Sequence, residues 1–293
     1  MLRFAVLGSG SSGNSAVLCS GQTRILIDAG LSARQLCLRL EKVGIDPDSL
    51  DAVVLTHEHS DHVCGLDVFC RKRKLAVYSC AHTCEIVRES VKSEVIWRQF
   101  VAGDGFQVGD IDVESFSVPH DAVDPVGFVF RSRKSSLGFV SDIGQVTGMV
   151  RHRLRGVNTL FVEANYDEVM LQNDLRRPWA TKQRIASRHG HLSNEQAAEL
   201  TVAAASPKMF RVVLGHLSSD CNTAEVASSF VSKELEAAGS GHVSVTCASQ
   251  REPMEMCEVA KSDVQKEVDR TGNPVVAEDT QPSGYTTQAE WSL

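Results

Sequence analysis

The sequence predicts an α/β fold, a four-layer αββα sandwich in which two sheets pack together and helices cover their outer faces. Two observations lead to this prediction. Short apolar runs that end in turns fill the first half of the chain, and strand-like runs are followed by segments with helical periodicity in both halves. A sheet covered by helices on one side must bury its other face, and a second sheet of the same kind provides that cover.

In the first half, the runs are bounded by residues that favour turns and helix ends. A glycine-rich stretch over residues 8–14 ends the first strand, and Gly21 and Gln22 link a predicted hairpin. Ser32 is typical of a helix N-cap and Gly44 of a helix end. The predicted strands are Leu2–Leu7, Ala16–Cys19, Arg24–Ile27, Asp51–Thr56 and Val77–Ser79, and the predicted helices are Ala33–Val43 and Val63–Arg73.

The second half continues the alternation. Residues 106–141 are rich in strand-forming runs, which are clearest over Val126–Phe130 and Leu137–Val140. The predicted strands beyond them are Thr159–Val162, Arg211–Leu214 and Val243–Thr246, and the predicted helices are Asn194–Ala205 and Ala224–Ala238. After residue 252 proline, serine, threonine, glutamine and acidic residues dominate. We therefore expect one folded catalytic domain over 1–252 and a polar, acidic tail over 253–293 that is disordered.

Composition narrows the class of protein. The chain has 293 residues, of which 42% are apolar and 23% charged, and these values are typical of a globular protein with a packed core. No apolar run approaches the roughly 18 residues of a membrane span. Nine cysteines without the spacing of a disulfide framework favour a reducing compartment. We expect a cytoplasmic protein with no membrane partner.

The strongest chemical signal lies directly after the predicted strand Asp51–Thr56. Four potential metal ligands, His57, His59, Asp61 and His62, fall within six residues. A strand end followed by a tight turn can direct several of these side chains into one cavity. Imidazole and carboxylate groups suit Zn²⁺, Mn²⁺ or Fe²⁺. The alternative, a polar surface loop, rarely concentrates ligands so densely.

The pattern His-x-His-x-Asp-His resembles the signature of the metallo-β-lactamase superfamily. That resemblance implies four further motifs in a fixed order, and a residue of the required type follows an apolar run at each place: Asp28, His120, Asp142 and His216. It implies a first metal on His57, His59 and His120. It implies a second metal on Asp61, His62 and His216, with Asp142 as the bridge between the two. Asp28 is expected to accept a hydrogen bond from a ligand histidine.

This resemblance implies hydrolysis by a hydroxide that bridges two divalent metals, zinc or manganese, with iron also compatible. Asp61 would both hold a metal and orient the nucleophile. A bridging aspartate favours phosphodiesters, whose anionic oxygens can lie between two cations.

Segments within and beyond the metal motifs together resemble a narrower group, the YycJ (WalJ) family of bacterial metallo-β-lactamase-fold proteins. The resemblance spans roughly residues 3–250 and is carried by Ser11–Asn14, His57–His62, Pro119–Ala122, Asn165–Glu168, Gly190–Glu195 and Leu214–Asn222. The resemblance implies 5′→3′ exonuclease activity on double-stranded DNA and a link to DNA repair.

Three of these segments hold candidate substrate contacts. Ser12 and Asn14 lie in a glycine- and serine-rich loop whose N–H groups could approach an anion, although such a run can also be a plain tight turn. His191 is a candidate general acid for the leaving oxygen or a phosphate contact. Asn222 follows the last ligand motif. The stretch 176–188 has five basic residues and no acidic ones, and is either a phosphate-facing patch or a solvated helix face.

Other functions stay open at this point. A phosphodiesterase for a small molecule, a cyclic nucleotide or RNA needs the same site, and so does a thioesterase like glyoxalase II. A regulatory protein that has lost its chemistry is disfavoured because all seven ligand positions are filled.

Overall fold

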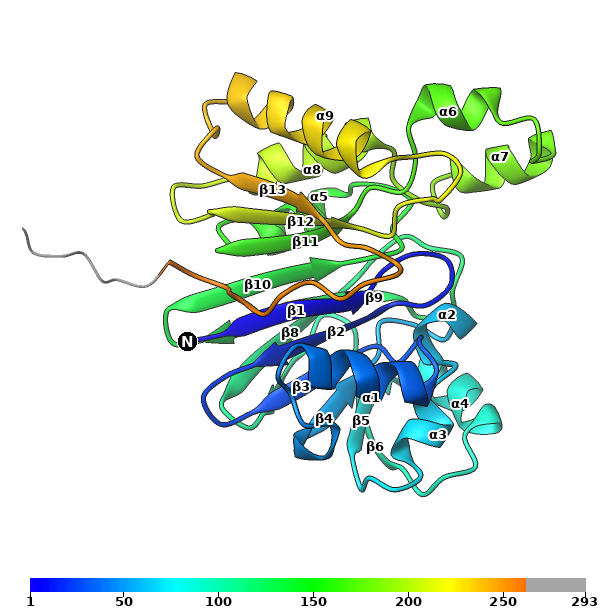
Figure 1. The fold of residues 1–293 in the computed structure, drawn as a ribbon, viewed down its shortest axis with the longest axis vertical. Coiled ribbons are helices and arrows are strands. Elements are labelled where there is room, and N and C mark those ends of the chain that lie inside the picture. Colours follow the sequence, from blue (N-terminus) through cyan, green and yellow to red (C-terminus); the bar gives the residue numbers. More distant parts are fainter. Residues whose placement is uncertain (262–293) are drawn as a thin grey trace, which may run out of the picture. The chain divides into compact units, whose positions relative to one another are not determined.

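The computed structural model describes residues 1–261 and shows two seven-stranded mixed sheets that pack against each other (Figure 1). The strand order is β14-β1-β2-β3-β4-β5-β6 in the first sheet and β13-β12-β11-β10-β9-β8-β7 in the second. The first sheet comprises β1 (Arg3–Gly8), β2 (Ser15–Cys19), β3 (Arg24–Ile27), β4 (Ala52–Val54), β5 (Ala76–Cys80), β6 (Ile96–Phe100) and β14 (Cys257–Glu258). The second comprises β7 (Gly105–Val108), β8 (Ile111–Ser117), β9 (Val126–Ser132), β10 (Ser135–Val140), β11 (Thr159–Glu163), β12 (Arg211–Gly215) and β13 (Ser244–Cys247).

Helices cover the outer face of each sheet, as Figure 1 shows. The helices on the first sheet are α1 (Ala33–Lys42), α3 (Leu66–Cys70) and α4 (Ala81–Ser90), and those on the second are α5 (Gly148–Leu154), α8 (Asn194–Ala204) and α9 (Ala224–Ala237). The remaining helical segments are η1 (Pro47–Ser49), α2 (Ser60–Val63), α6 (Glu168–Asn173) and α7 (Trp179–Ile185). The predicted αββα arrangement is confirmed.

Three separate hydrophobic clusters fill the spaces between the four layers. The cluster between the sheets includes Phe4, Phe128 and Phe130, and the other two lie between each sheet and its helices. Residues of one strand alternate between clusters. Phe128 and Phe130 of β9 face the opposite sheet, whereas Val129 between them packs toward the helices. This alternation is the two-residue period of a strand that is buried on both faces.

Parallel pairing brings several strand ends to one edge of the sandwich. In the first sheet β3, β4 and β5 run parallel, and in the second β10, β11 and β12 do so. In an open α/β sheet, the crevice outside the carboxyl ends of parallel strands is where ligands bind. The polar residues that follow these strands therefore meet at this edge.

Two expectations from the sequence need correction. The predicted helix Val63–Arg73 forms only over α3, whereas α2 ends at Val63, where the prediction begins. Between them lies Gly65, where a Cβ atom would lie 1.9 Å from the backbone oxygen of Leu31. The folded body also continues past residue 252. Met254 donates its N–H to Val6 (2.8 Å), and β14 pairs with β1. Apolar residues anchor this segment, so the body extends to Ala260. The rest of the expected tail lies outside the described residues.

Val259 is expected to stabilise the body although it lies in the segment assigned to the tail. Its side chain is fully buried in the cluster between the sheets, and its backbone N–H donates to Leu2 (2.9 Å). Val259→Ala should therefore lower the free energy of unfolding by about 2 kcal/mol, from lost burial plus a residual cavity. Chemical denaturation measures the change. A variant as stable as the wild type would show that this segment does not dock, and Val169→Ala, at a 65% exposed position, is the control.

None of the helices in residues 1–261 has the length and apolar character needed to cross a bilayer. All nine cysteines lie among these residues and are free thiols.

Candidate metal centre

The chain positions its candidate ligands by ending strands directly before them. Asp28 follows β3, His57 lies shortly after β4, Asp142 follows β10 with one residue between, and His216 follows β12. Asp28, Asp142 and His216 have backbone φ angles of 57°, 46° and 53°. Non-glycine residues rarely adopt this left-handed conformation, and it persists where the surrounding structure enforces it, often at functional sites. The sharp turn after each strand directs these side chains toward one another.

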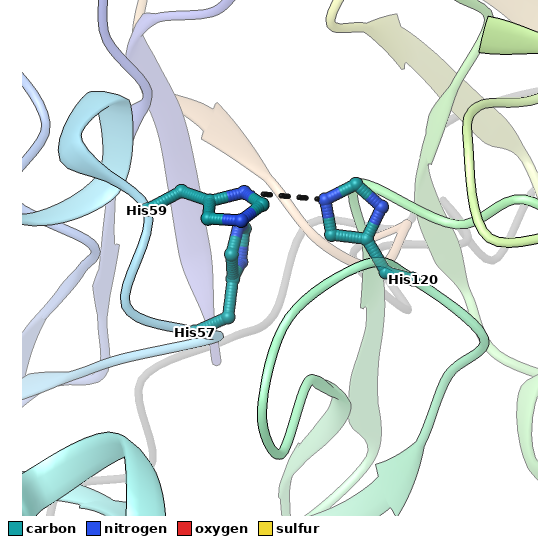
Figure 2. Close-up of side chains that lie close together, drawn as sticks. All are labelled: His57, His59 and His120. Carbon is teal, nitrogen blue, oxygen red and sulfur yellow. Dashed lines mark hydrogen bonds between the residues drawn. The ribbon is translucent and has the colours of Figure 1, made fainter. Parts of the chain in front are cut away.

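One set of ligands consists of three histidines, His57, His59 and His120, whose rings converge in Figure 2. Nε2 of His120 lies 3.4 Å from Nδ1 of His59. Nδ1 of His120 is 3.1 Å from the carbonyl oxygen of Gly190 and donates to it, because a carbonyl can only accept. The tautomer that follows leaves Nε2 of His120 with a free lone pair directed at the other two rings.

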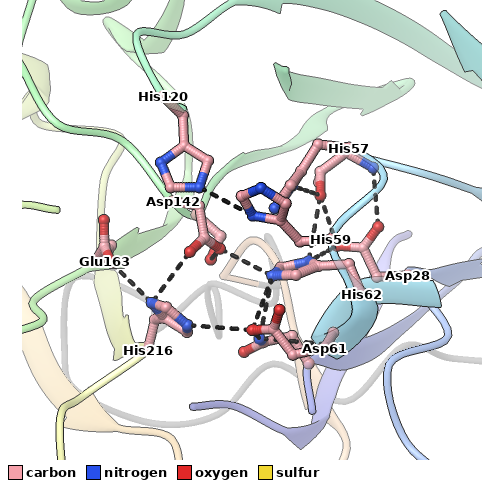
Figure 3. A network of polar contacts seen from close by, with 12 residues as sticks. Asp28, His57, His59, Asp61, His62, His120, Asp142, Glu163 and His216 are labelled. Carbon is pink, nitrogen blue, oxygen red and sulfur yellow. Dashed lines mark hydrogen bonds and ion pairs between the residues drawn. The ribbon is translucent and has the colours of Figure 1, made fainter. Parts of the chain in front are cut away.

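A second set consists of Asp61, His62 and His216. Nδ1 of His62 is 2.8 Å from Oδ2 of Asp28, which orients the ring and leaves Nε2 toward the set. We expected Asp28 to accept a hydrogen bond from one of the candidate ligand histidines, and His62 lies at the right distance to donate it. The side-chain amide of Asn14 donates to Oδ2 of Asp61 (3.1 Å) and so fixes the carboxylate from the other side. Figure 3 shows the network.

Asp142 lies between the two sets. Its Oδ2 is 2.9 Å from Nε2 of His62, and its Oδ1 is 3.3 Å from Nδ1 of His216. Asp142 also groups with His57 of the first set, with their potential ligand atoms within 4.8 Å of one another. The carboxylate is buried. A single side chain therefore contacts or approaches members of both sets.

The protein surroundings shift the pKa values of the candidate ligand histidines in different directions in the two sets. Burial lowers the pKa of His57 well below its ordinary value, and it also lowers the pKa of His120. Burial opposes the charged form of His62 too, but Asp142 and Asp28 outweigh it and raise the pKa of His62 to about 10. For Asp142, burial is outweighed by His216 and His62, which hold the pKa of its carboxyl well below the usual range. His57 and His120 are thus kept neutral, whereas His62 carries a proton.

The residues fit divalent metal ions. Nε2 of His57 and Nε2 of His216 are buried and have no hydrogen-bond partner among the described residues. A buried polar atom without a partner costs free energy, so such atoms at a cluster of imidazoles and carboxylates indicate a ligand that accepts their lone pairs. Imidazole nitrogens and carboxylate oxygens are the donors that Zn²⁺ and similar cations bind.

A buried glutamate beside the cluster was missed by the sequence analysis. Glu163 ends β11, and its Oε1 is 2.8 Å from Nδ1 of His216 and 2.6 Å from Nδ1 of His191. Burial opposes the proton on His191, but Glu163 outweighs it, so the pKa of His191 is raised. Because Glu163 holds Nδ1, the nitrogen of His191 available to a substrate is Nε2. A carboxylate directly after the apolar run Thr159–Val162 was the signal that could have identified it.

Comparisons with known proteins agree with this geometry. Residues 23–216 match the family described as beta-lactamase superfamily domain. The chain is 35% identical to exodeoxyribonuclease YycJ of Bacillus anthracis over 82% of its own length and 91% of the relative's. It is equally identical to exodeoxyribonuclease WalJ of Streptococcus pneumoniae, with 82% and 90% covered. The chain belongs to the YycJ/WalJ family of the beta-lactamase superfamily. As a family member it is a metal-dependent hydrolase, and the fold implies divalent metal ions.

The fold of this YycJ/WalJ family member also matches solved structures. The metallo-beta-lactamase fold protein YhfI from Bacillus subtilis superposes with a TM-score of 0.65 at 15% identity, covering 86% of this chain and 98% of that one. At this identity the match supports the fold alone.

The glycine- and serine-rich loop is not arranged as an anion cradle. The backbone N–H of Gly10 donates to Asn14, that of Ser12 to Gln250, and that of Asn14 to Asp61. The N–H groups of Ser9 and Gly13 are also bonded within the protein. The loop instead presses Asn14 against Asp61. Ser12 itself is exposed, and it contacts Gln250 through its backbone N–H.

Asn222 does not reach the cluster in this member of the YycJ/WalJ family. It is buried, and its amide donates to the carbonyl oxygen of Ala164 (2.9 Å) and to the side chain of Asn194 (2.8 Å). These bonds brace the loop after His216 against the start of α8. The expected substrate contact is therefore replaced by a structural one. Ser9 contacts a candidate ligand directly, because its hydroxyl oxygen accepts a hydrogen bond from the backbone N–H of His216 (2.7 Å).

Gly30 is expected to be essential because the backbone of the ligand loop passes directly over it. A Cβ atom at Gly30 would lie 1.6 Å from the backbone oxygen of Asp61. Gly30→Ala must therefore displace Asp61 and His62, and a misplacement of about 1 Å at a catalytic site can cost roughly 100-fold in rate. Turnover and metal content measure the effect. Gly148→Ala is the control, because a Cβ there meets nothing within 4 Å. Equal activity of both variants would contradict the assigned position of Asp61.

Proposed function

We propose that the chain is a two-metal phosphodiesterase that degrades DNA from an end in the 5′→3′ direction. The observation that carries the proposal is the position of Asp142 between two ligand sets. A shared carboxylate suits a pair of cations, and a pair of cations suits a phosphodiester. The naming of both relatives as exodeoxyribonucleases supports DNA as the substrate.

The proposed ligand assignment follows the two sets. His57, His59 and His120 would hold one cation, and Asp61, His62 and His216 the other, with Asp142 placed near both sets. Two divalent cations held there would supply charge neutralisation for a phosphoryl group and a water that ionises near neutral pH. Zinc and manganese are the proposed metals, with iron also compatible with these donors.

We assign the orientation of the nucleophile and the protonation of the leaving group to two protein side chains, Asp61 and His191. Asp61, fixed by Asn14, orients the nucleophile on the side of the second set. His191 stands beside both sets, with its ring centroid 5.3 Å from that of His120 and 5.1 Å from that of His216. Glu163 fixes the ring and favours its protonated form. We assign to Nε2 of His191 the transfer of a proton to the leaving oxygen.

The test uses duplex DNA labelled at its 5′ ends, incubated with the purified protein and Mn²⁺. Release of labelled mononucleotides or short products before the duplex shortens at its 3′ ends is the expected result. A duplex RNA of the same sequence and a cyclic nucleotide serve as competing substrates. Faster hydrolysis of either one, with the DNA intact, would overturn DNA as the substrate while retaining the metal chemistry.

Metal binding at neutral pH is expected to release protons. Ligand histidines bind metals in their neutral form, and the pKa of His62, about 10, means that this ring is protonated at pH 7.5 before a metal binds. Burial opposes the proton on His216 as well, but Asp142, Asp61 and Glu163 outweigh it and raise the pKa of that ring well above its ordinary value. Zn²⁺ loading measured by calorimetry in two buffers of different ionisation enthalpy should therefore show proton release from both His62 and His216. The affinity should weaken as the pH is lowered, about tenfold per pH unit for each proton displaced. Asp28→Asn should reduce the release; equal heats in both buffers for the wild type would contradict the protonated state of His62.

A further inference from the structure

Helix α7 and its flanks form an arm, residues 174–188, that the proposed metal chemistry does not use. Figure 1 shows α6 and α7 projecting at the end of the sandwich where α2 carries its ligands. No residue of α7 is buried. Trp179, at its start, is 68% exposed, although large aromatic side chains normally dominate cores and interfaces.

Ion pairs and a small apolar cluster hold the arm in place. Arg177 bonds Asp174 and Asp220, and Arg176 bonds Asp220 (2.6 Å). Ile185 packs on a cluster beneath the arm that includes Leu171. The sequence left this stretch open as a phosphate-facing patch or a solvated helix face, and in the structure Arg176 and Arg177 are engaged by carboxylates. These contacts also present Trp179 from a fixed support, which reduces the entropy lost when a ligand binds it.

The arm adjoins the metal centre directly. Nε of Arg184 lies 2.8 Å from Oδ2 of Asp121, and the other oxygen of Asp121 is 3.4 Å from Nε2 of His120. The backbone N–H of His191 donates to the carbonyl oxygen of Ile185 (2.9 Å). The helical rise places Trp179 about 8 Å along the axis from Arg184, a distance of roughly two stacked bases at 3.4 Å each.

The charge of the arm suits an anionic chain. Three of its five basic side chains, Arg176, Arg177 and Arg184, pair with the carboxylates Asp121, Asp174 and Asp220, whereas Lys182 donates to the carbonyl oxygen of Gln172. Five basic groups against three carboxylates leave positive charge in excess. Single-stranded nucleic acid is bound in proteins by this combination of a positively charged surface and an exposed aromatic ring on which a base stacks.

From these observations we propose that Trp179 is a stacking platform for an unpaired base of the nucleic-acid strand whose phosphodiester lies at the metal centre. The inference rests on the proposed function, since it concerns the substrate of the same site. Every base has an aromatic face, so binding at Trp179 is independent of sequence. The platform holds the strand a few nucleotides from the bond that is cut, and it takes no part in the chemistry.

The test measures binding apart from cleavage. Fluorescein-labelled 12-nucleotide oligo(dT) and oligo(dA) with phosphorothioate linkages are titrated with metal-loaded protein, and anisotropy reports the Kd. Trp179→Ala should weaken binding of both by about 10- to 100-fold, whereas Trp179→Phe should stay near the wild type. Leu175→Ala is the matched control, because Leu175 is 98% exposed on the same arm but has no aromatic ring. All these variants should hydrolyse bis(p-nitrophenyl) phosphate at the wild-type rate.

Each other outcome has a definite meaning. Wild-type binding by Trp179→Ala, or an equal loss in Leu175→Ala, would overturn the stacking platform. Degradation of duplex DNA with a KM unchanged in Trp179→Ala would overturn the platform and leave the proposed function standing. Oligonucleotide binding that depends on Trp179, without cleavage of any DNA, would overturn the proposed function and support the platform. A wild-type protein that proved dimeric in solution and became monomeric in Trp179→Ala, with oligonucleotide binding unchanged, would overturn the platform and assign the arm to self-association.

Discussion

Asp142→Ala is expected to remove activity and metal together. The carboxylate approaches members of both ligand sets, so its loss takes a ligand from each proposed cation and the negative charge that lies between them. We expect turnover on DNA to fall by roughly 10³-fold or more and metal content to fall below two ions per chain. Asp142→Asn should behave in the same way, because an amide keeps the size of the side chain and lacks its charge.

The controls separate this effect from unfolding. Removing one partner of a buried charged pair costs about 3–5 kcal/mol, so the variant is compared with the wild type by circular dichroism and thermal melting, both without metal. Asp112→Ala removes an exposed carboxylate from β8 and should change neither activity nor metal content. A folded Asp142→Ala protein that still binds two metals and cleaves DNA would remove the bridge from the mechanism.

His191→Ala is expected to slow the reaction and leave the metals bound. A positioned general acid contributes about 10²–10⁴-fold, and the proposed role of His191 is to protonate the leaving oxygen. The loss should therefore depend on the leaving group. A DNA phosphodiester, whose leaving alkoxide needs a proton, should lose the full factor, whereas a p-nitrophenyl ester of thymidine 5′-monophosphate should lose little.

Two further comparisons make this prediction specific. Glu163→Gln keeps a polar group beside Nδ1 of His191 but removes the charge that raises its pKa, so its defect should be in the same direction and smaller. Metal content of both variants is measured beside the rates. Equal losses on the two substrates would show that His191 positions the substrate or the metals and does not donate a proton.

Several candidate ligand positions follow a local rule that the sequence shows. His57, Asp142 and His216 stand just beyond the end of an apolar strand, and the ends of parallel strands share one edge of a sheet. Asp142 and His216 are recognisable in this way, and the same rule applied to Glu163 would have added it. No metal-ligand motif of the superfamily marks Glu163, so only its place at the end of an apolar strand distinguishes it.

Other features depend on contacts between distant segments and have no local signal. Asn222 follows a ligand motif as a substrate contact would, yet its amide is taken by Asn194 and the backbone of Ala164. The glycine-rich loop has the composition of an anion site, but Gln250, far away in the chain, occupies one of its donors. β14 is only two residues long, Cys257–Glu258, and exists because β1 offers a free edge beside it.

We propose that two metals, bound side by side, support the hydrolysis of DNA by this protein. The most direct test removes all metal from the wild-type protein, adds back Mn²⁺ or Zn²⁺ in steps, and measures bound metal and DNA degradation on the same samples. Activity is expected to stay low through the first equivalent, to rise with the second and to reach its plateau at two ions per chain. Full activity at one ion per chain, or degradation by metal-free protein, would contradict it.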